Sequence, residues 1–335
     1  MGSPSDSSAL HQDAIVLDCL LTGGHYPEDT TFLQEMRDEG GVTATYASLE
    51  SGQLWEGFDQ VLDSLGSWAR GFKRDSDLLM SVTQVSHITD AKKSRKLGII
   101  LGFQSTKPIQ DRLDYIDIFY QLGIRVIQLT YQGRNLVGDG SGERTDSGIS
   151  RFGVQAIERM NELGILIDLS HVGMRSTMEA IELSRKPCAF THSNPRSLRE
   201  SVRNKTDEQI RALARRGGVM GLVAFAPFLP QREKSTLNDF IDMVDYVADL
   251  VGIEHVGLGL DFSPWERPSE YEKMATSHPE IHGGLTFATR YPKELSSPSF
   301  LPTLTQRLAE RNYSCEDIKK VLGGNFLRLL SEVWS

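Results

Sequence analysis

Short apolar runs rich in β-branched residues recur along the chain, and each is followed by a stretch in which apolar residues have helical spacing. This alternation is typical of parallel βα units, in which a helix connects one strand to the next. Eight such runs predict an α/β fold of the closed (β/α)8 type, a TIM barrel. The predicted strands are 14–18, 42–48, 97–102, 125–130, 165–169, 187–191, 218–223 and 255–260, with 79–84 as an extra candidate.

The segments around these strands complete a single predicted domain over residues 1–335. Apolar residues recur at helical spacing through 236–250, which predicts a helix there. Residues 262–298 contain five prolines after the last strand and are predicted to form a long active-site loop. We expect disorder in 1–10, and two helical segments over 301–335 on the barrel exterior, the second interrupted at Gly323-Gly324.

Composition narrows the class of protein. The formal net charge of -9 and the pI of about 5.5 argue against a nucleic-acid partner, which requires clustered Lys and Arg. Cys19, Cys188 and Cys315 are odd in number and widely spaced, as expected for free thiols in a reducing compartment. The polar start MGSPSDSSALHQD lacks a signal-peptide pattern, and no apolar run approaches roughly 18 residues. We therefore expect a cytoplasmic protein without a membrane partner.

Polar side chains that directly follow barrel strands are the first candidates for chemistry, because the carboxyl ends of the strands meet at one face. His171 follows the strand in ILIDLSHVG, His192 follows the strand in PCAFTHSNP, and Asp261 follows the strand in VGLGLDFSP. The segment TYQGRN adds Tyr131 and Asn135 after the fourth strand. These residues predict one polar site at the barrel mouth.

Two imidazoles and a carboxylate around that mouth are typical ligands of a divalent transition metal, most often zinc, which activates water for hydrolysis. Asp261 is either a ligand or the general base. A structural role, as a cap or a hydrogen-bonded side chain, is the alternative for each residue. Arg203 precedes a helix with Thr206 as its expected N-cap, and its charge suits either a substrate carboxylate or a surface ion pair. Asp168 is assigned no role.

At these residues the chain resembles the renal, or membrane, dipeptidase family of metal-dependent amidohydrolase barrels. The similarity spans nearly the whole chain. The resemblance implies a (β/α)8 barrel, hydrolysis of dipeptides and a homodimer. Its most specific blocks are LGIRVIQLTYQGRNLVGDG, GILIDLSHVG, PCAFTHSNPRSLRESVRNKTDEQI and HVGLGLDFSP.

The resemblance also assigns roles to single residues. His171 and His192 correspond to the two later ligands of the family's two zinc ions, and Asp261 corresponds to its last-strand aspartate. Arg203 corresponds to the arginine that binds the substrate carboxylate. Tyr131 stands at the position of the family's histidine that stabilises the tetrahedral intermediate, and as a phenol it donates one hydrogen bond.

The chain departs from the family at three metal ligands. Leu20 and Thr22 stand where the family has its His-x-Asp pair, and Gln104 stands where it has the bridging Glu. Neither an apolar side chain nor a neutral amide replaces the lost carboxylates. We therefore expect one zinc ion rather than two, held by His171, His192 and a further ligand.

The resulting hypothesis is a metal-dependent hydrolase of the membrane dipeptidase type. Asp261 and Tyr131 are its expected catalytic residues, and Arg203, Asn135 and Gln104 are its expected substrate-binding residues. The further zinc ligand is left open, and its candidates are Gln104, Tyr131, Cys19 and His25. Two alternatives remain: a one-metal barrel enzyme that acts on a non-peptide carboxylate-bearing metabolite, and a metal-free binding protein.

Overall fold

The computed structural model describes residues 4–49 and 57–334, and it confirms the predicted TIM barrel. Eight parallel strands form a closed ring, because β2 pairs with both β1 and β4. The order around the ring is β1-β2-β4-β5-β6-β7-β8-β9. The strands are β1 (Leu17–Thr22), β2 (Ala44–Ser48), β4 (Leu97–Phe103), β5 (Ile124–Gln128), β6 (Leu166–Asp168), β7 (Ala189–Phe190), β8 (Val219–Leu222) and β9 (Val256–Leu258).

The extra candidate strand also forms, as β3 (Leu79–Ser81), which pairs only with the start of β4. The end of β4 pairs with β5, so β3 lies outside the ring. The predicted first strand, 14–18, begins three residues too early. The reason is that the helix preceding it runs to Asp13, and strand pairing with β2 starts at Leu17.

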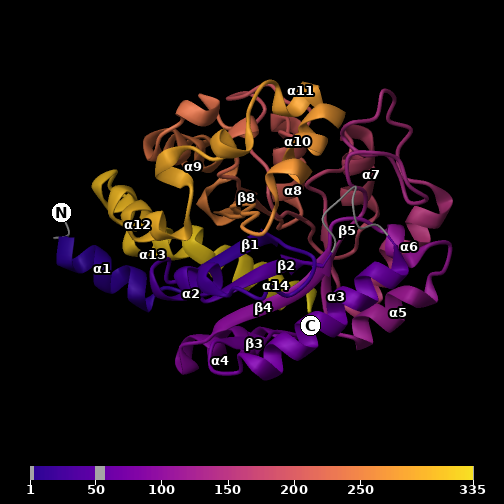
Figure 1. Ribbon diagram of the computed structural model, residues 1–335. Coiled ribbons are helices and arrows are strands. Elements are labelled where there is room, and N and C mark those ends of the chain that lie inside the picture. The colour runs from indigo at the N-terminus through magenta and orange to yellow at the C-terminus, as the bar shows by residue number, and fades with distance from the viewer. Residues whose placement is uncertain (1–3, 50–56, 335) are drawn as a thin grey trace.

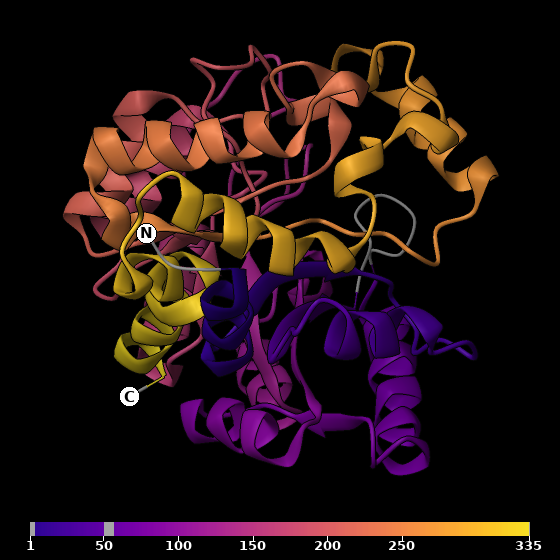
Figure 2. The same cartoon turned by 90° about the vertical axis from the view of Figure 1, so that its left-hand side faces the viewer.

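Helices cover the outside of the ring (Figures 1 and 2). The predicted helix at 236–250 is confirmed as α9 (Leu237–Val251), and Thr236 closes a capping box with Asp239. Thr206 is confirmed as the N-cap of α8 (Asp207–Arg215). The other covering helices are α2 (Thr31–Asp38), α3 (Phe58–Arg74), α4 (Val85–Ser94), α5 (Asp114–Gln121), α6 (Arg151–Leu163) and α7 (Met174–Leu183). Shorter helical turns are η1 (Lys107–Ile109), η2 (Ala226–Phe228), η3 (Arg232–Lys234), η4 (Ile253–His255), η5 (Phe287–Thr289), η6 (Lys293–Leu295) and η7 (Pro298–Phe300).

The last segment of the chain packs on α1 (Pro4–Asp13) and α9 at its start and against strands β1, β8 and β9 at its end. It comprises α12 (Leu301–Glu310), α13 (Cys315–Lys319), the π-helical turn η8 (Lys320–Gly324) and α14 (Asn325–Val333). The predicted interruption is present at Gly323, whose backbone leaves helical geometry and approaches Ile15 and Leu17. Phe326 packs in one core cluster with Val126 and Val219 of the strands. The expectation that this segment packs on the barrel exterior is therefore wrong for α14.

Two further expectations need correction. Residues 4–10 belong to α1 (Pro4–Asp13), and the ring of His11 in this helix is hydrogen-bonded to Thr305 Oγ1 at 2.7 Å and to Gly40 O at 3.0 Å. These hydrogen bonds hold the helix in place although its polar composition predicts disorder. Residues 1–3 lie outside the described part of the chain. The loop at 262–298 contains α10 (Pro268–Ser277) and α11 (Pro279–His282), each begun by a proline, which is favoured at the first helical position.

No helix among the described residues has the length and apolar character needed to span a membrane.

Candidate active site

The polar site lies at the carboxyl ends of the barrel strands. Gln104 and Tyr131 follow β4 and β5, His171 and His192 follow β6 and β7, and Asp261 follows β9. Gln104, Tyr131, His171 and Asp261 line one cavity with a volume of about 500 Å³. His192 is buried beside it and contacts Gln104 and His171. The structure thus brings the five residues into one site.

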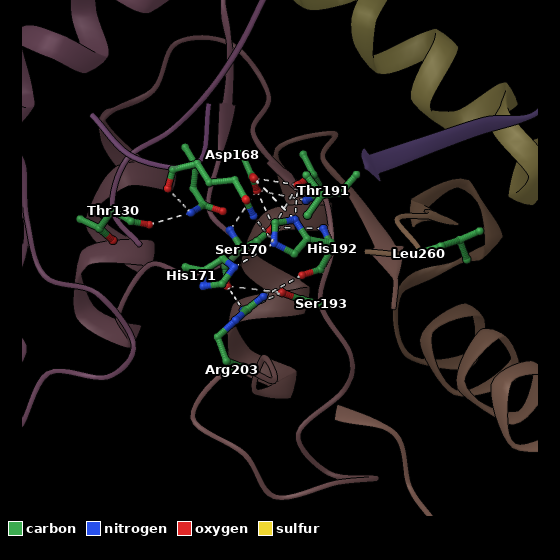
Figure 3. A network of polar contacts seen from close by, with 12 residues as sticks. Thr130, Asp168, Ser170, His171, Thr191, His192, Ser193, Arg203 and Leu260 are labelled. Atoms are coloured by element: carbon green, nitrogen blue, oxygen red, sulfur yellow. Dashed lines mark hydrogen bonds and ion pairs between the residues drawn. The ribbon is translucent and has the colours of Figure 1, made fainter. Parts of the chain in front are cut away.

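The two histidines face each other through equivalent ring atoms. Nε2 of His171 lies 3.0 Å from Nε2 of His192 (Figure 3). Nε2 of Gln104 lies 3.2 Å from the same atom of His192. Both rings are buried. Burial, followed by the charge of nearby Arg203, lowers the pKa of both histidines well below the usual value. Both imidazoles are therefore neutral, with lone pairs available at neutral pH.

Thr191 connects His192 to a buried carboxylate and so fixes its tautomer. Oγ1 of Thr191 donates to Oδ2 of Asp168 over 2.7 Å and lies 2.7 Å from Nδ1 of His192. A hydroxyl has one hydrogen, so the contact to His192 requires that Nδ1 of His192 donates. Nε2 of His192 then carries the lone pair that faces His171. Nδ1 of His171 is buried and finds no hydrogen-bond partner among the described residues.

Asp168 receives this contact as part of a dense set of hydrogen bonds. The backbone N–H groups and the hydroxyls of Ser170 and Thr191 all donate to its carboxylate. Burial raises the pKa of Asp168, and these four donors oppose the rise. No role for Asp168 is predicted from the sequence, because its position at the end of β6 says nothing about a partner on the next strand.

Tyr131 and Asp261 form other parts of the cavity wall. The ring of Tyr131 stacks on that of His171, with centroids 4.1 Å apart and planes at 21°. Asp261 has a φ of 62°, a left-handed conformation that is strained for a non-glycine residue and frequent at functional sites. Burial raises the pKa of Asp261 to about 8, although the charge of Arg203 opposes this rise. The carboxyl of Asp261 therefore exchanges its proton near neutral pH.

Arg203 and Asn135 do not reach the cavity. Arg203 is fully buried, and its guanidinium donates to the carbonyl oxygens of Ser170 and His192. Nδ2 of Asn135 donates to the Leu129 carbonyl over 2.8 Å and thereby shapes its own loop. Binding of a substrate by these two residues stays a prediction. Arg203 acts on the site through its charge and by holding the two histidine loops together.

The altered first strand supplies no carboxylate to the histidines. Leu20 is fully buried in the core, and the hydroxyl of Thr22 donates to the Phe262 carbonyl over 3.2 Å. Cys19 is buried in the same core cluster as Leu20 and does not line the cavity, whereas His25 does. Of the open candidates for a further ligand, Gln104 makes a hydrogen-bond contact with the histidine pair through His192.

The donor set fits one divalent ion. Zn–N bonds of about 2.0–2.1 Å at tetrahedral angles place two nitrogens about 3.3 Å apart. The Nε2 separation of 3.0 Å between His171 and His192 is close to this value. If the amide of Gln104 is rotated by a half-turn, its Oε1 takes the place of Nε2 beside His192 and becomes a third donor. Among the described residues there is no group of three or more His, Cys, Asp or Glu side chains that could hold a metal ion, so the amide of Gln104 is counted as a donor beside the two histidines.

Comparison with known proteins agrees with this architecture. The family model described as "Membrane dipeptidase (Peptidase family M19)" matches residues 26–283 and 280–335. An uncharacterized dipeptidase, C965.12, of Schizosaccharomyces pombe is 30% identical over 77% of this chain and 58% of its own length. Dipeptidase verJ of Clonostachys rogersoniana is 28% identical over 78% of this chain and 62% of its own length. The chain thus spans about 60% of the length of these relatives.

Solved structures show the same fold along the whole chain. An amidohydrolase from Pseudomonas aeruginosa superposes with a TM-score of 0.90 at 33% identity and covers 99% of both chains. A metallo peptidase from Rhodobacter sphaeroides, liganded with a phosphinate mimic of the dipeptide L-Ala-D-Ala, has a TM-score of 0.81 at 20% identity and covers 96% of this chain. Since the family model matches most of the chain, the protein belongs to the membrane dipeptidase family, Peptidase family M19.

Proposed function

We propose that the protein is a hydrolase of the dipeptidase type, which cleaves a dipeptide or a related small amide with a free carboxylate. The observation that carries this proposal is the convergence of His171 and His192 beside the cavity, with neutral rings and facing Nε2 atoms. These two residues, with the amide oxygen of Gln104, would hold a single divalent ion, with zinc as the first choice. Family membership and the dipeptidase relatives support the same reaction class.

When bound, such an ion polarises the substrate carbonyl and lowers the pKa of water at the site. The other steps belong to side chains of the cavity wall. Asp261 takes a proton from the attacking water and passes it to the leaving amine, for which a pKa of about 8 is well placed. Tyr131 donates a hydrogen bond to the carbonyl oxygen as it gains negative charge. Arg203, which lies close enough to influence the pKa of Asp261, adds positive charge that favours a substrate carboxylate.

A panel of dipeptides tests the proposal, including dehydro forms and forms with D-residues. Mass spectrometry of the products should show cleavage by the parent protein and none by a His192→Ala variant with the same fold by circular dichroism. The replacement of the family's carboxylates by Thr22 and Gln104 favours one alternative, a non-peptide metabolite with a carboxylate as substrate. Protein that binds one ion and cleaves no member of the panel would support that alternative and contradict the dipeptidase proposal.

The proposal includes a cytoplasmic location and a homodimer. All three cysteines are free, and Cys19 and Cys188 are buried, which fits a reducing compartment. The dimer rests on the family resemblance alone, and light scattering of the purified protein measures it.

A further inference from the structure

The cavity has two chemically different sides. The barrel side carries Gln104, Tyr131, His171 and Asp261. The opposite side is built by the segment after β8 and by α10 and α11, which lie at the top of the view in Figure 1. This cover contributes the apolar side chains of Phe225, Phe228, Met274 and Ile281, which lie beside polar ones that include Lys273, Ser277, His278 and His282. The reaction described above uses the barrel side and leaves the cover without a role.

The apolar cover is a packed, preformed surface. Phe225, Phe228, Tyr271 and Ile281 belong to a core cluster separate from those of the barrel, and Met274 packs against it. The rings of Phe225 and Phe228 lie 5.6 Å apart, and those of Phe225 and Tyr271 lie 6.3 Å apart. Edge-to-face and tilted aromatic pairs of this kind hold one another in place. The wall therefore keeps its shape without a ligand.

Charged side chains of the cover pair with one another. Glu266 also lines the cavity, and its carboxylate lies 3.6 Å from Nε of Arg290. Glu270 forms an ion pair with Arg267, and both of these residues lie on the cavity wall. Pairing reduces the net charge that these groups present to a ligand. Phe225, Phe228, Met274 and Ile281 form the apolar part of the cover.

We propose that the cover is a binding subsite for a large apolar group, aromatic or branched aliphatic, carried by the substrate next to its scissile amide. This inference rests on the proposed function and names its substrate class. A volume of about 500 Å³ lies in the range of pockets that hold drug-sized ligands, which exceeds the need of a dipeptide with two small side chains. With such a small ligand, water would remain against Phe225, Phe228 and Met274, whereas a large apolar group displaces that water.

Binding of three simple probes tests the subsite. N-acetylglycine carries the amide and the carboxylate alone, N-phenylacetylglycine adds a ring on the acyl side, and N-acetylphenylalanine adds a ring on the amine side. Isothermal calorimetry gives each dissociation constant, and mass spectrometry afterwards shows whether the probe was cleaved. We expect at least one aromatic probe to bind about ten-fold or more tightly than N-acetylglycine, as even one methylene in an apolar pocket produces a difference of this size.

Variants of Met274, which is partly exposed on α10, test whether the tighter binding of aromatic probes arises at the cover. Met274→Gln keeps the length of the side chain but is polar. It should reduce the ratio of the dissociation constant of N-acetylglycine to that of the preferred aromatic probe at least three-fold. Met274→Leu is the matched apolar control and should keep the ratio. Equal binding of all three probes, or a ratio that Met274→Gln leaves unchanged, would overturn the inference even if the probes are cleaved. Strong aromatic preference without any cleavage would support the subsite, and the panel of dipeptides then decides on the proposed hydrolase.

Discussion

Nε2 of His171 lies 3.0 Å from Nε2 of His192, a hydrogen-bond distance at which one of the two nitrogens donates a hydrogen to the other. The contacts of Thr191 place the proton of His192 on Nδ1, so the hydrogen between the rings belongs to His171. An ion that binds both Nε2 atoms must displace it. Nδ1 of His171, which lacks a partner among the described residues, is the position that can receive it. The pair can therefore bind an ion while both rings stay neutral.

Removing the hydroxyl of Thr191 should weaken ion binding. Thr191→Val keeps the shape of the side chain but leaves Nδ1 of His192 and the carboxylate of Asp168 each without one partner. Because such partners orient metal-binding imidazoles, we expect zinc affinity to fall about 10- to 100-fold. Competition titration with a chelator dye measures the affinity. Thr191→Ser restores the hydroxyl and should stay near the parent value; equal losses in both variants would contradict the role of the hydroxyl.

Adding a carboxylate at position 104 should strengthen the same site. The amide of Gln104 contacts Nε2 of His192 at 3.2 Å, so Gln104→Glu places a negative oxygen beside the two imidazoles. Two histidines and one carboxylate are a common zinc ligand set, and we expect zinc affinity to rise at least ten-fold. Gln104→Met, which has similar length and no oxygen donor, should lower the affinity. Glu and Met variants with the same affinity as the parent would show that position 104 does not face the ion.

Asp18 should make stability depend on pH. Its Oδ1 accepts from the backbone of Leu20 and Leu260, whereas its buried Oδ2 finds no donor among the described residues. Burial raises the pKa of Asp18 to about 7, so the folded state binds its proton more tightly than the unfolded state, whose pKa is about 3.9. The free energy of unfolding therefore falls as the pH rises between these values.

The variant Asp18→Asn removes this dependence. Its advantage over the parent should grow by about 1.4 kcal/mol for each pH unit between pH 5 and pH 6, where the two states differ by one proton. Urea unfolding at a series of pH values measures the difference. Asp111→Asn, at an exposed position, serves as the control without such a slope. A parallel pH dependence of Asp18→Asn and the parent would mean that Asp18 is ionised in the folded protein.

The variant Asp261→Asn shows whether Asp261 acts as the general base or as a metal ligand. As the general base, it should be essential for turnover but not for ion binding, so Asp261→Asn should lower kcat/KM about 100- to 10,000-fold and leave the zinc stoichiometry unchanged. Kinetics on a dipeptide cleaved by the parent, together with metal analysis of the variant, measure both effects. Loss of the ion from Asp261→Asn would assign Asp261 to the ligands.

Much of the fold follows from local sequence patterns. The alternation of apolar runs and amphipathic segments predicts the ring of strands, Thr206 as an N-cap predicts the start of α8, and apolar residues at helical spacing predict α9. The helix α1 and the helices α10 and α11 are missed for a physical reason. Their sequences are polar or rich in proline, and α1 is held by contacts with residues far along the chain, such as Thr305.

Part of the candidate site also follows from the sequence. The ends of parallel strands meet at one face, which is enough to bring His171, His192 and Asp261 into one region. The link from His192 to Asp168 joins two strands through Thr191, and no spacing along the chain reveals it. The burial of Arg203 is also a tertiary property, since the carbonyls that accept its hydrogen bonds belong to Ser170 and His192.

Metal analysis shows whether His171 and His192 together hold a single ion. Protein purified without added metal is incubated with zinc, passed through a desalting column and measured by inductively coupled plasma mass spectrometry, together with His171→Ala and His192→Ala. We expect one zinc ion per chain, a higher unfolding temperature in the presence of zinc, and loss of both effects in either variant. Two ions per chain, or no ion and no change in unfolding temperature, would contradict this expectation.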